Sequence, residues 1–566
     1  MTSEASELRR AGFAPDGKYR NGAATVTGQW QRLAEERSLA GALAMRADTA
    51  PVTIQARVSD LADLALTLIR EQGAHFTDLF VEPAETGDGM TIRALLAVPQ
   101  ARAWRWLFLT APLASGRLAY TALTPALPVA GWYERELWDE AGVLPEGHPA
   151  LQRLRLPSAW PAGQSPWRAP GASPETAREA RVTALEADDE LPELAPAPEG
   201  IVDYPLGPVR SGVVESGHYT LRTAGEEIVD IRLKLFYKHR GVERRAEGLA
   251  PSHLPLLAER ISGTSGFAHA LAVCEAIERA AGVAVPPRAQ YLRVIFAELE
   301  RLYNHLGYHA DLCQATGLVV GQAQLEILKE RVLRLNARLT GHRYLFGVCV
   351  PGGVAYDPSE EALRAIQTLV GSMRARMRRL GRMLMDSPSH VDRLEGTGVL
   401  PADEALAMGM VGPNGRASGV NRDLRRDHPY AAYDDLAFDA PVERGGDALA
   451  RARVRLTEIT QSLHLIEQAI TRLPSGPARL DSTDMAPILA EGALTGAALG
   501  WVESPRGEGT HWARFGADGR VARYRARPAS FANAQAFPLC VPGRNILTDF
   551  PVIEQSWGLS FAGVDR

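Results

Sequence analysis

The stretch RAQYLRVIFAELERLYNHLGYHADLCQA, residues 288–315, decides the fold of the larger part of this chain. Its apolar side chains recur at spacings of three and four residues, which is the repeat of an α-helix buried along a wide face. Pro286 and Pro287 before it are a typical helix start, and Gly317 is a typical stop. The pattern therefore predicts one long helix over 288–315. The apolar face consists of Leu292, Ile295, Phe296, Leu299, Leu302, Tyr303 and Leu306.

Three further segments, 325–344, 360–385 and 447–473, have the same helical character. Long helices with short joints favour an antiparallel bundle. The arginine-dense segment 374–382 lies within the second of them, and we interpret it as a side that faces solvent or another subunit.

β-Structure is expected on both sides of the bundle. The first hairpin is predicted from 213–221 and 229–235 around a turn at 224–226, and the second from 511–515 and 521–527. The return arm of the first hairpin alternates apolar and charged residues, which predicts one buried and one solvated face. The apolar positions are Val229, Ile231, Leu233 and Leu235.

The rest of the chain divides by composition. Residues 1–50 resemble a loosely ordered lead-in, and 51–157 a small α/β domain with a helix at 61–72 and strands at 76–83 and 90–98. Residues 158–200 are rich in Pro and Ala and carry an acidic run, so they bury too little apolar surface to fold. The predicted fold class is α+β: a small N-terminal α/β domain, a linker, then a large domain (201–566) with β-hairpins flanking a long antiparallel helix bundle.

Composition excludes several functions. The 566 residues are 46% hydrophobic and 23% charged with a net charge of -5, so a globular fold is expected and nucleic acid is not. No apolar run is long enough for a membrane helix, and the first 20 residues lack a signal peptide's apolar core, so a cytoplasmic protein is expected. The four cysteines form no CxxC pair, and we interpret them as small buried apolar residues without disulfides. They are Cys274, Cys313, Cys349 and Cys540.

One ordered motif lies in the small domain. It reads Trp132-Tyr-Glu-Arg-Glu-Leu-Trp-Asp-Glu-Ala-Gly142, then Gly147-His-Pro149 and Leu154-Arg-Leu-Pro157. This order and spacing resemble the signature of the smaller hydrophilic subunit of respiratory complex I. The resemblance implies a docking surface for assembly rather than a catalyst.

The large domain carries a longer ordered set of motifs. They are Gly207-Pro208, His239-Arg-Gly-Val-Glu243, Glu259-Arg-Ile-Ser-Gly-Thr-Ser-Gly-Phe-Ala-His269, Glu298-Leu-Glu-Arg-Leu-Tyr-Asn-His-Leu306, Gly341-His-Arg343, Pro351-Gly-Gly353, Gly412-Pro413, Arg416-Ala-Ser-Gly419, Asp423-Leu-Arg425, Pro429-Tyr-Ala-Ala-Tyr433 and Val564-Asp-Arg566. The set resembles the large hydrophilic subunit of complex I and the large subunit of energy-converting [NiFe] hydrogenases of the formate hydrogenlyase and hydrogenase-4 type.

The resemblance to hydrogenases implies two CxxC pairs that hold nickel. Here Ser262 and Ser265 stand in the early pair, and Ser560 and Gly563 in the late pair. A soft redox metal needs thiolates, whereas a serine hydroxyl stays protonated at neutral pH and is a hard, poor ligand. We therefore expect no metal and no hydrogen chemistry.

In complex I the same place is a quinone cavity beside a [4Fe-4S] cluster that a small partner subunit holds. Quinone reduction needs hydrogen-bond donors and an acidic relay. The family's histidine in the first hairpin loop is missing here, with His218 three residues beyond Glu215, and its tyrosine is Arg260. The candidate donors are Arg260, Ser262, Ser265 and His218, and the candidate residues that bind the quinone are Ser262, Ser265, His269 and Ser560.

Glu243 matches an acid near the cavity in both relatives and is the candidate proton carrier, with an ion pair to Arg240 or Arg244 as the alternative. His269 reads as a satisfied core histidine more than as a relay. His305 is expected to make an interhelical hydrogen bond. The resemblance also makes Asp549 and Asp565 secondary relay candidates.

The sequence thus predicts an oxidoreductase subunit of a membrane-associated, NADH:quinone oxidoreductase-like or hydrogenase-like complex. Expected partners are a small iron–sulfur subunit and proton-channel or antiporter-like membrane subunits, with peripheral attachment on the cytoplasmic side of the inner membrane. The chain has no GxGxxG fingerprint, so NAD would act only through a partner. The alternatives are a catalytically silent scaffold and a [NiFe] hydrogenase with unusual ligands.

Overall fold

The computed structural model describes residues 51–83, 89–100, 104–114, 116–156, 160, 165–166, 197–210, 215–490 and 492–566. The chain forms two compact units: residues 1–197 with 407–409, and residues 198–406 with 410–566. The predicted lead-in and most of the predicted linker lie outside the described residues, so their boundaries stay predictions. Among the described helices, none has the length and apolar character needed to cross a bilayer.

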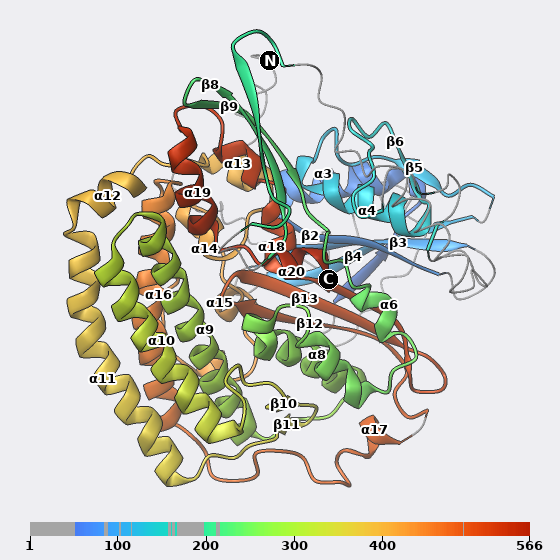
Figure 1. The fold of residues 1–566 in the computed structure, drawn as a ribbon. Helices are drawn as coiled ribbons and strands as arrows, with labels where there is room; N and C mark the ends of the chain where they lie inside the picture. The colour runs from blue at the N-terminus through green and yellow to red at the C-terminus, as the bar shows by residue number, and fades with distance from the viewer. Residues whose placement is uncertain are drawn as a thin grey trace. The chain divides into compact units, whose positions relative to one another are not determined.

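The first unit is a four-stranded sheet with two main helices (Figure 1). The strand order is β1-β4-β3-β2, antiparallel except for the parallel β1–β4 pair. The predicted helix and both predicted strands are confirmed, each within one residue. The elements are β1 Val52–Gln55, α3 Leu61–Gln72, β2 His75–Pro83, β3 Met90–Pro99, β4 Trp104–Leu113, α4 Gly131–Ala141, and the short parallel pair β5 Ala119–Thr121 and β6 Leu144–Glu146.

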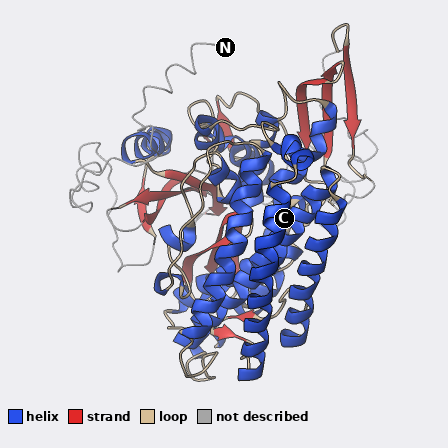
Figure 2. Cartoon of the chain, turned by 90° about the vertical axis from the view of Figure 1, so that its left-hand side faces the viewer, coloured by secondary structure: helices blue, strands red, loops and turns tan. Residues whose placement is uncertain are grey.

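The second unit is built on four long helices that lie side by side (Figure 2). They are α9 Pro287–Ala315, α10 Val319–Thr340, α11 Glu360–Met385 and α16 Ala448–Thr471. The bundle confirms the helical periodicity, and the apolar stripe of α9 is buried. The prediction that the second helix continues to residue 344 is wrong, because the left-handed Gly341 (φ 80°) ends α10 at Thr340.

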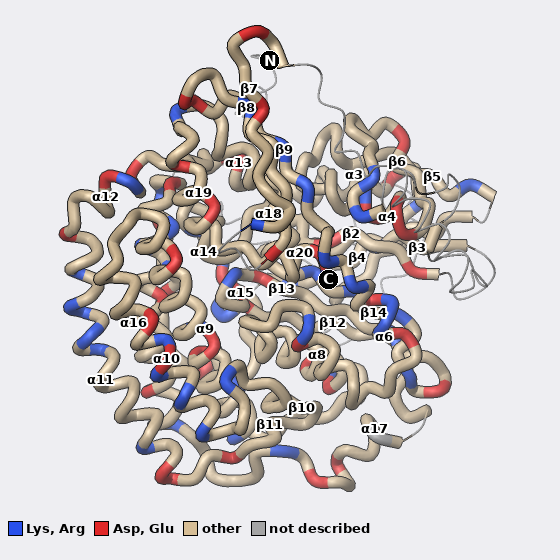
Figure 3. The backbone as a smooth tube through the Cα atoms, viewed as in Figure 1, with Lys and Arg blue, Asp and Glu red and all other residues tan. Residues whose placement is uncertain are grey.

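The arginine-dense stretch of α11 lies on the outer face of the bundle, as expected (Figure 3). Met373, Met377 and Leu380 face the core, whereas Arg376 and Arg379 between them are exposed. The helical repeat therefore separates the two faces of the helix.

A three-stranded antiparallel sheet follows the bundle, formed by β12 Gly496–Ser504, β13 Gly507–Phe515 and β14 Val521–Arg527. The sequence predicted only a hairpin from the last two strands. Helix α8, Gly266–Ala281, packs on this sheet. A Cβ atom at Gly500 of β12 would lie 1.7 Å from the carbonyl oxygen of Ala272, so only glycine permits this approach.

The first predicted hairpin is also one edge of a three-stranded sheet, β7 Ile201–Leu206, β8 His218–Ala224 and β9 Glu227–Lys234. Residues 213 and 214 of its predicted first arm lie outside the described part of the chain. The alternation predicted for the return arm holds in part: Ile231 and Leu235 are buried, but Leu233 is half-buried like its charged neighbours and Val229 is exposed. A register shift beside Thr223 pairs it with Ile228, so Ile228 is buried and Val229 is exposed.

Shorter elements complete the second unit. They are α6 Val242–Ala246, α7 Leu254–Ala258, β10 Cys349–Val350, β11 Gly353–Val354, α12 Pro388–Leu394, α13 Ala402–Ala407, α14 Gly412–Ala417, α15 Leu424–Asp427, α17 Ala486–Leu489, α18 Ala529–Ala534, α19 Phe550–Trp557 and α20 Phe561–Asp565. The mixture of a helical bundle and small sheets confirms the α+β class. All four cysteines are buried and free, as expected.

Candidate functional site

Two serines from distant parts of the sequence meet in the core of the second unit. Ser262 Oγ donates to Ser560 Oγ at 3.0 Å, and both residues are buried. Each serine sits in extended backbone just before a helical turn, Ser262 ahead of α8 and Ser560 at the N-cap of α20. The Ser560 hydroxyl accepts from the Gly563 N–H at 3.1 Å, which fixes its rotamer.

The other two positions of the predicted pairs lie next to these serines. A Cβ atom added at Gly563 would be 3.4 Å from Ser560 Oγ and 3.8 Å from Ser262 Cβ. The Ser265 N–H donates to the Ser262 carbonyl at 2.9 Å. The two segments predicted to share a site therefore do come together, and we call residues 259–269 with 556–566 the paired segments.

Arg506 joins the paired segments, although sequence reasoning did not single it out. Its guanidinium group donates to Ser265 Oγ at 2.8 Å, to Asn304 Oδ1 at 3.1 Å and to the Gly558 carbonyl at 3.0 Å. Burial lowers the pKa of Arg506. It lies in the turn between β12 and β13, so only the three-stranded sheet that the sequence did not predict brings it here.

Two acids also reach the paired segments. The Glu215 carboxylate accepts from Ser560 Oγ at 3.1 Å and from the Phe561 N–H. Glu300 of α9 accepts from the Phe267 and Ala268 N–H groups, at 2.9 and 3.0 Å, and so caps the start of α8. Burial raises the pKa of Glu300 to about 8, although these two N–H groups act in the opposite direction.

Two predicted donors, Arg260 and His218, make contacts with residues other than the paired serines. The Arg260 side chain is 57% exposed and stacks 4.5 Å from the centre of the Phe346 ring. His218 is buried in β8, with Nε2 3.2 Å from Thr220 Oγ1. Burial lowers the pKa of His218. Neither of these contacts involves Ser262 or Ser560, so the role of both side chains as donors stays a prediction.

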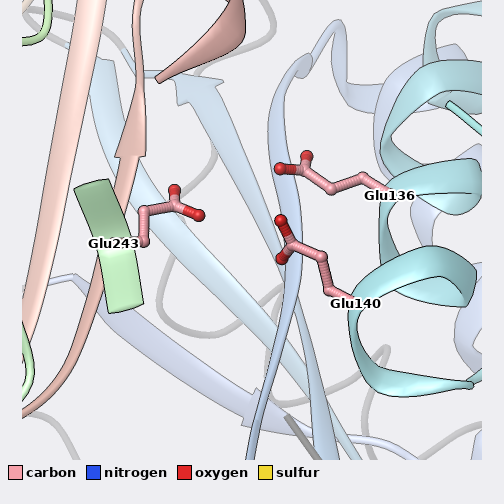
Figure 4. Close-up of side chains that lie close together, drawn as sticks. All are labelled: Glu136, Glu140 and Glu243. Carbon is pink, nitrogen blue, oxygen red and sulfur yellow. The ribbon is translucent and has the colours of Figure 1, made fainter. Parts of the chain in front are cut away.

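Glu243 sits in the short helix α6 and is buried (Figure 4). It accepts from the Ala526 N–H at 2.9 Å and pairs with Arg566 at 3.2 Å and Arg525 at 3.5 Å. The alternative partners named from sequence make other contacts: Arg244 pairs with Glu247, and Arg240 donates to the carbonyls of Arg260, Ile261 and Ala562. The alternative was wrong because it considered only arginines near Glu243 in sequence, whereas Glu243 pairs with Arg525 of β14 and with Arg566 at the C-terminus.

His269 is buried on the first turn of α8 and is hydrogen-bonded, as a satisfied core histidine should be. Its Nδ1 lies 3.0 Å from His511 Nε2, and His511 Nδ1 lies 2.6 Å from the Tyr524 hydroxyl. Burial lowers the pKa of His269 to about 3 and drives that of His511 well below its usual range. Both rings are therefore neutral at physiological pH.

Asp549 and Asp565, the two secondary relay candidates, accept hydrogen bonds from backbone N–H groups. Asp565 accepts from the Phe236 and Lys238 N–H groups, each at 2.8 Å, so it ties α20 to the end of β9. Asp549 accepts from the Ile546 N–H at 3.0 Å, within its own turn.

A buried ionic cluster connects α9 and α16. His305 Nε2 lies 2.6 Å from Glu458 Oε2, which confirms the predicted interhelical hydrogen bond. Burial opposes ionisation of Asp423, but the guanidinium groups of Arg425 and Arg416 hold its pKa at about 2. The cluster also includes Glu298, Arg301 and Glu503.

A cavity of about 560 Å³ lies beside this cluster rather than at the paired serines. It is lined by residues of α15, α16 and the loop between them, among them Arg425, Tyr433, Phe438, Gln461 and His464. Tyr433 donates to Glu298, so the cavity reaches the edge of the ionic cluster.

The motif of the first unit forms a local structure in α4. Glu134 accepts from the Tyr120 hydroxyl at 2.9 Å and from the Leu123 N–H at 2.7 Å. Glu136 and Glu140 extend from the same side of α4, one turn apart (Figure 4), and both pair with Arg155. These acids therefore fold the chain that follows α4 back onto the helix.

The second unit brings together two segments with the spacing of CxxC pairs, in which Ser262, Ser265, Ser560 and Gly563 replace the cysteines. Together with the small α/β unit, this arrangement defines an oxidoreductase subunit of the complex I and [NiFe] hydrogenase class. Three family models match: the 30 kDa subunit of respiratory-chain NADH dehydrogenase over residues 54–173, nickel-dependent hydrogenase over 240–315, and the 49 kDa subunit of respiratory-chain NADH dehydrogenase over 317–566. The chain belongs to the family in which the 30 and 49 kDa subunits are fused in one polypeptide.

Known relatives come from both branches of this class. The chain is 31% identical to formate hydrogenlyase subunit 5 of Escherichia coli (strain K12), covering 91% of this chain and 89% of that one. It is 30% identical to the C/D subunit of NADH-quinone oxidoreductase from Acidiphilium cryptum (strain JF-5), covering 80% and 82%. A solved structure of the membrane-bound sulfane sulfur reductase, an archaeal respiratory membrane complex, contains a chain that aligns with a TM-score of 0.61 at 28% identity, over 66% of this chain and 100% of that one.

Proposed function

We propose that this chain passes electrons from an iron–sulfur cluster in a small partner subunit to a quinone-type acceptor held at the paired segments. The observation that carries the proposal is the meeting of Ser262, Ser560 and Gly563 at one point of the core. The two families joined in this chain use that kind of meeting point for redox chemistry.

The donor set at this point does not suit a soft metal. Ser262 and Ser560 offer protonated hydroxyls that are already hydrogen-bonded, and Gly563 offers no side chain. Nickel of the hydrogenase type needs thiolates, which none of these positions supplies. This argues against a [NiFe] hydrogenase with unusual ligands.

The same groups suit a carbonyl-bearing acceptor. A quinone takes up two electrons and two protons when it is reduced. Arg506 and the two serine hydroxyls carry hydrogen-bond donors that would turn from their present partners to the acceptor, and burial raises the pKa of Glu300 to about 8. A carboxyl group that is protonated at neutral pH can act as a general acid. Ser265 accepts a hydrogen bond from Arg506 and would thereby position the Arg506 guanidinium group.

The proposed partners follow from the relatives, which are named as subunits of complexes. We propose a small iron–sulfur subunit docked at the paired segments and proton-channel or antiporter-like membrane subunits, with this chain attached peripherally on the cytoplasmic side of the inner membrane. Any link to NAD would run through a further partner.

One observation favours a second candidate, a catalytically silent scaffold. The Ser262 hydroxyl donates to Ser560 and the Ser560 hydroxyl donates to Glu215, so both hydroxyl protons are already bonded within the chain and the site needs no ligand. The scaffold would organise the same partners without a substrate.

The test uses the complex purified with its partner subunits. Nickel content and hydrogen uptake with a viologen dye are measured beside reduction of a short-chain benzoquinone. Quinone reduction without stoichiometric nickel supports the proposal. Stoichiometric nickel with hydrogen uptake supports the hydrogenase alternative, and the absence of both activities supports the scaffold.

A variant pair sharpens the result. Arg260→Ala removes the exposed cation beside Phe346, and Arg244→Ala removes a cation of similar exposure that pairs with Glu247. Loss of inhibition by a quinone analogue in the first variant alone supports a quinone site close to Arg260. Equal behaviour of the two variants removes Arg260 from the site.

A further inference from the structure

A continuous line of buried hydrogen-bonding groups crosses the second unit from α8 to β14. It begins at His269, passes through His511 of β13 and ends at Tyr524 of β14, with separations of 3.0 and 2.6 Å. All three side chains are at least 97% buried. Burying such polar groups costs desolvation free energy unless they are hydrogen-bonded, and here the bonds within the line engage His269 Nδ1, both ring nitrogens of His511 and the Tyr524 hydroxyl.

The sheet and helix fix the line in place. His511 pairs with Gly500 in the register of β12 and β13, and Gly500 is where α8 approaches the sheet most closely. His269 lies one turn before Ala272, the residue whose carbonyl sits over Gly500. Tyr524 is two residues from Ala526, the cross-strand partner of His511, so it is a diagonal neighbour within side-chain reach.

Each end of the line lies at a charged group. At the His269 end, the Arg506 guanidinium that holds Ser265 contributes, after burial, to lowering the pKa of His269. At the Tyr524 end, burial first and then the nearby Glu243 carboxylate raise the pKa of the phenol well above its usual range. The Glu243 carboxylate also accepts from the backbone N–H of Ala526 at 2.9 Å, two residues along β14 from Tyr524.

We propose that Tyr524, His511 and His269 form a proton relay that carries protons from Glu243 to the acceptor at the paired segments. The inference rests on the proposed function and names its proton path. In one passage the Tyr524 O–H proton moves to His511 Nδ1, the His511 Nε2 proton moves to His269 Nδ1, and the His269 Nε2 proton moves to an oxygen of the quinone-type acceptor.

The balance is one proton in and one proton out. Tyr524 regains a proton that enters from solvent by way of Glu243, and each imidazole ends as its other tautomer, so the rings must reset between passages. The electrons come from the partner's cluster and do not travel through these residues. Neutral imidazoles suit this task because each has one donor and one acceptor nitrogen.

The test interrupts the relay with single substitutions that change as few atoms as possible. In the purified complex, the cluster is reduced with dithionite and its reoxidation by a short-chain benzoquinone is followed by stopped flow in H₂O and D₂O. Tyr524→Phe removes one hydroxyl, and His511→Gln keeps polarity but cannot pass a proton between two ring nitrogens. Tyr430→Phe is the control, because it also removes one buried tyrosine hydroxyl, which contacts the Glu503 N–H.

The relay predicts that Tyr524→Phe and His511→Gln lower the rate constant of cluster reoxidation at saturating quinone about 100-fold. The quinone concentration that gives half of this maximal rate should be unchanged, and the solvent isotope effect of the wild type should change in both variants but not in Tyr430→Phe. A wild-type rate constant and isotope effect in both relay variants overturn the relay alone. Failure of the wild-type complex to reduce the quinone overturns the proposed function and the relay together.

Discussion

The hydroxyl oxygens of Ser262 and Ser560 lie 3.0 Å apart although 298 residues separate them in sequence. Ser262 precedes α8 and Ser560 is the N-cap of α20, so the contact joins the segment before α8 to the C-terminal segment of the chain. Both members stand three residues before a second position of the predicted pairs, Ser265 and Gly563. Because of this contact, it can be tested whether the four positions lie close enough together to bind one metal ion.

Restoring four thiols should create a metal site. In the variant with Ser262→Cys, Ser265→Cys, Ser560→Cys and Gly563→Cys, we expect one Co²⁺ or Zn²⁺ ion per chain, because tetrathiolate sites bind such ions tightly. The Cβ added at Gly563 meets its neighbours at ordinary contact distances of 3.4 Å or more. The readout is the thiolate charge-transfer absorption of Co²⁺. A folded variant that titrates no metal would show that the four positions do not converge.

Glu300 makes stability depend on pH in a predictable direction. Its pKa is about 8 in the folded chain against an ordinary 4.5, so the folded state keeps a proton that the unfolded state loses. Unfolding free energy from this group therefore falls as pH rises from 4.5 to about 8, by at most about 1.4 kcal/mol per pH unit. Glu300→Gln lacks this slope. The variant should gain stability relative to wild type across that window, measured by thermal unfolding at several pH values, and a constant difference would contradict the buried acid.

The C-terminal ion pair should be costly to break. Arg566→Ala leaves the buried Glu243 carboxylate without its 3.2 Å partner, and the loss is expected to be about 3 kcal/mol. Arg364→Ala, which removes an exposed pair with Glu360, should cost less than about 0.5 kcal/mol. Chemical denaturation of both variants gives the comparison. Equal losses would mean that Glu243 finds other compensation.

Gly500 should tolerate no side chain. Gly500→Ala places a Cβ against the Ala272 carbonyl, so α8 must move off the sheet at a cost of about 1–3 kcal/mol. Gly371→Ala in the exposed part of α11 meets nothing within 4 Å and should instead stabilise the chain by about 0.5–1 kcal/mol. Thermal unfolding separates them. A stable Gly500→Ala variant would refute the close packing that sets His269 against His511.

Much of the fold follows from local patterns. The apolar repeat of residues 288–315 predicted α9, and the segment 360–385 matches α11 at both ends. Such helices are encoded by their own spacing. Strand β12 was missed because its sequence, with Gly496 and Gly500, lacks the alternation of a half-buried strand, and glycine there serves close packing with α8.

The site was predicted in part. The motif resemblance brought Ser262 and Ser560 together correctly, because it encodes a long-range relation that composition does not. It did not identify Arg506, Glu215 or Glu300 as site residues, which reach the same place from a turn, a loop and the long helix. Their roles depend on burial and on partners that are distant in sequence, and neither can be predicted from the local spacing of residues.

The most direct measurement of the central claim is photoaffinity labelling of the purified complex with an azidoquinone, followed by peptide mapping. The account predicts label in residues 259–269 and 556–566, and its loss when excess unlabelled quinone competes. Label that maps to other parts of the complex, or that competing quinone does not displace, would contradict an acceptor site at the meeting point of Ser262 and Ser560.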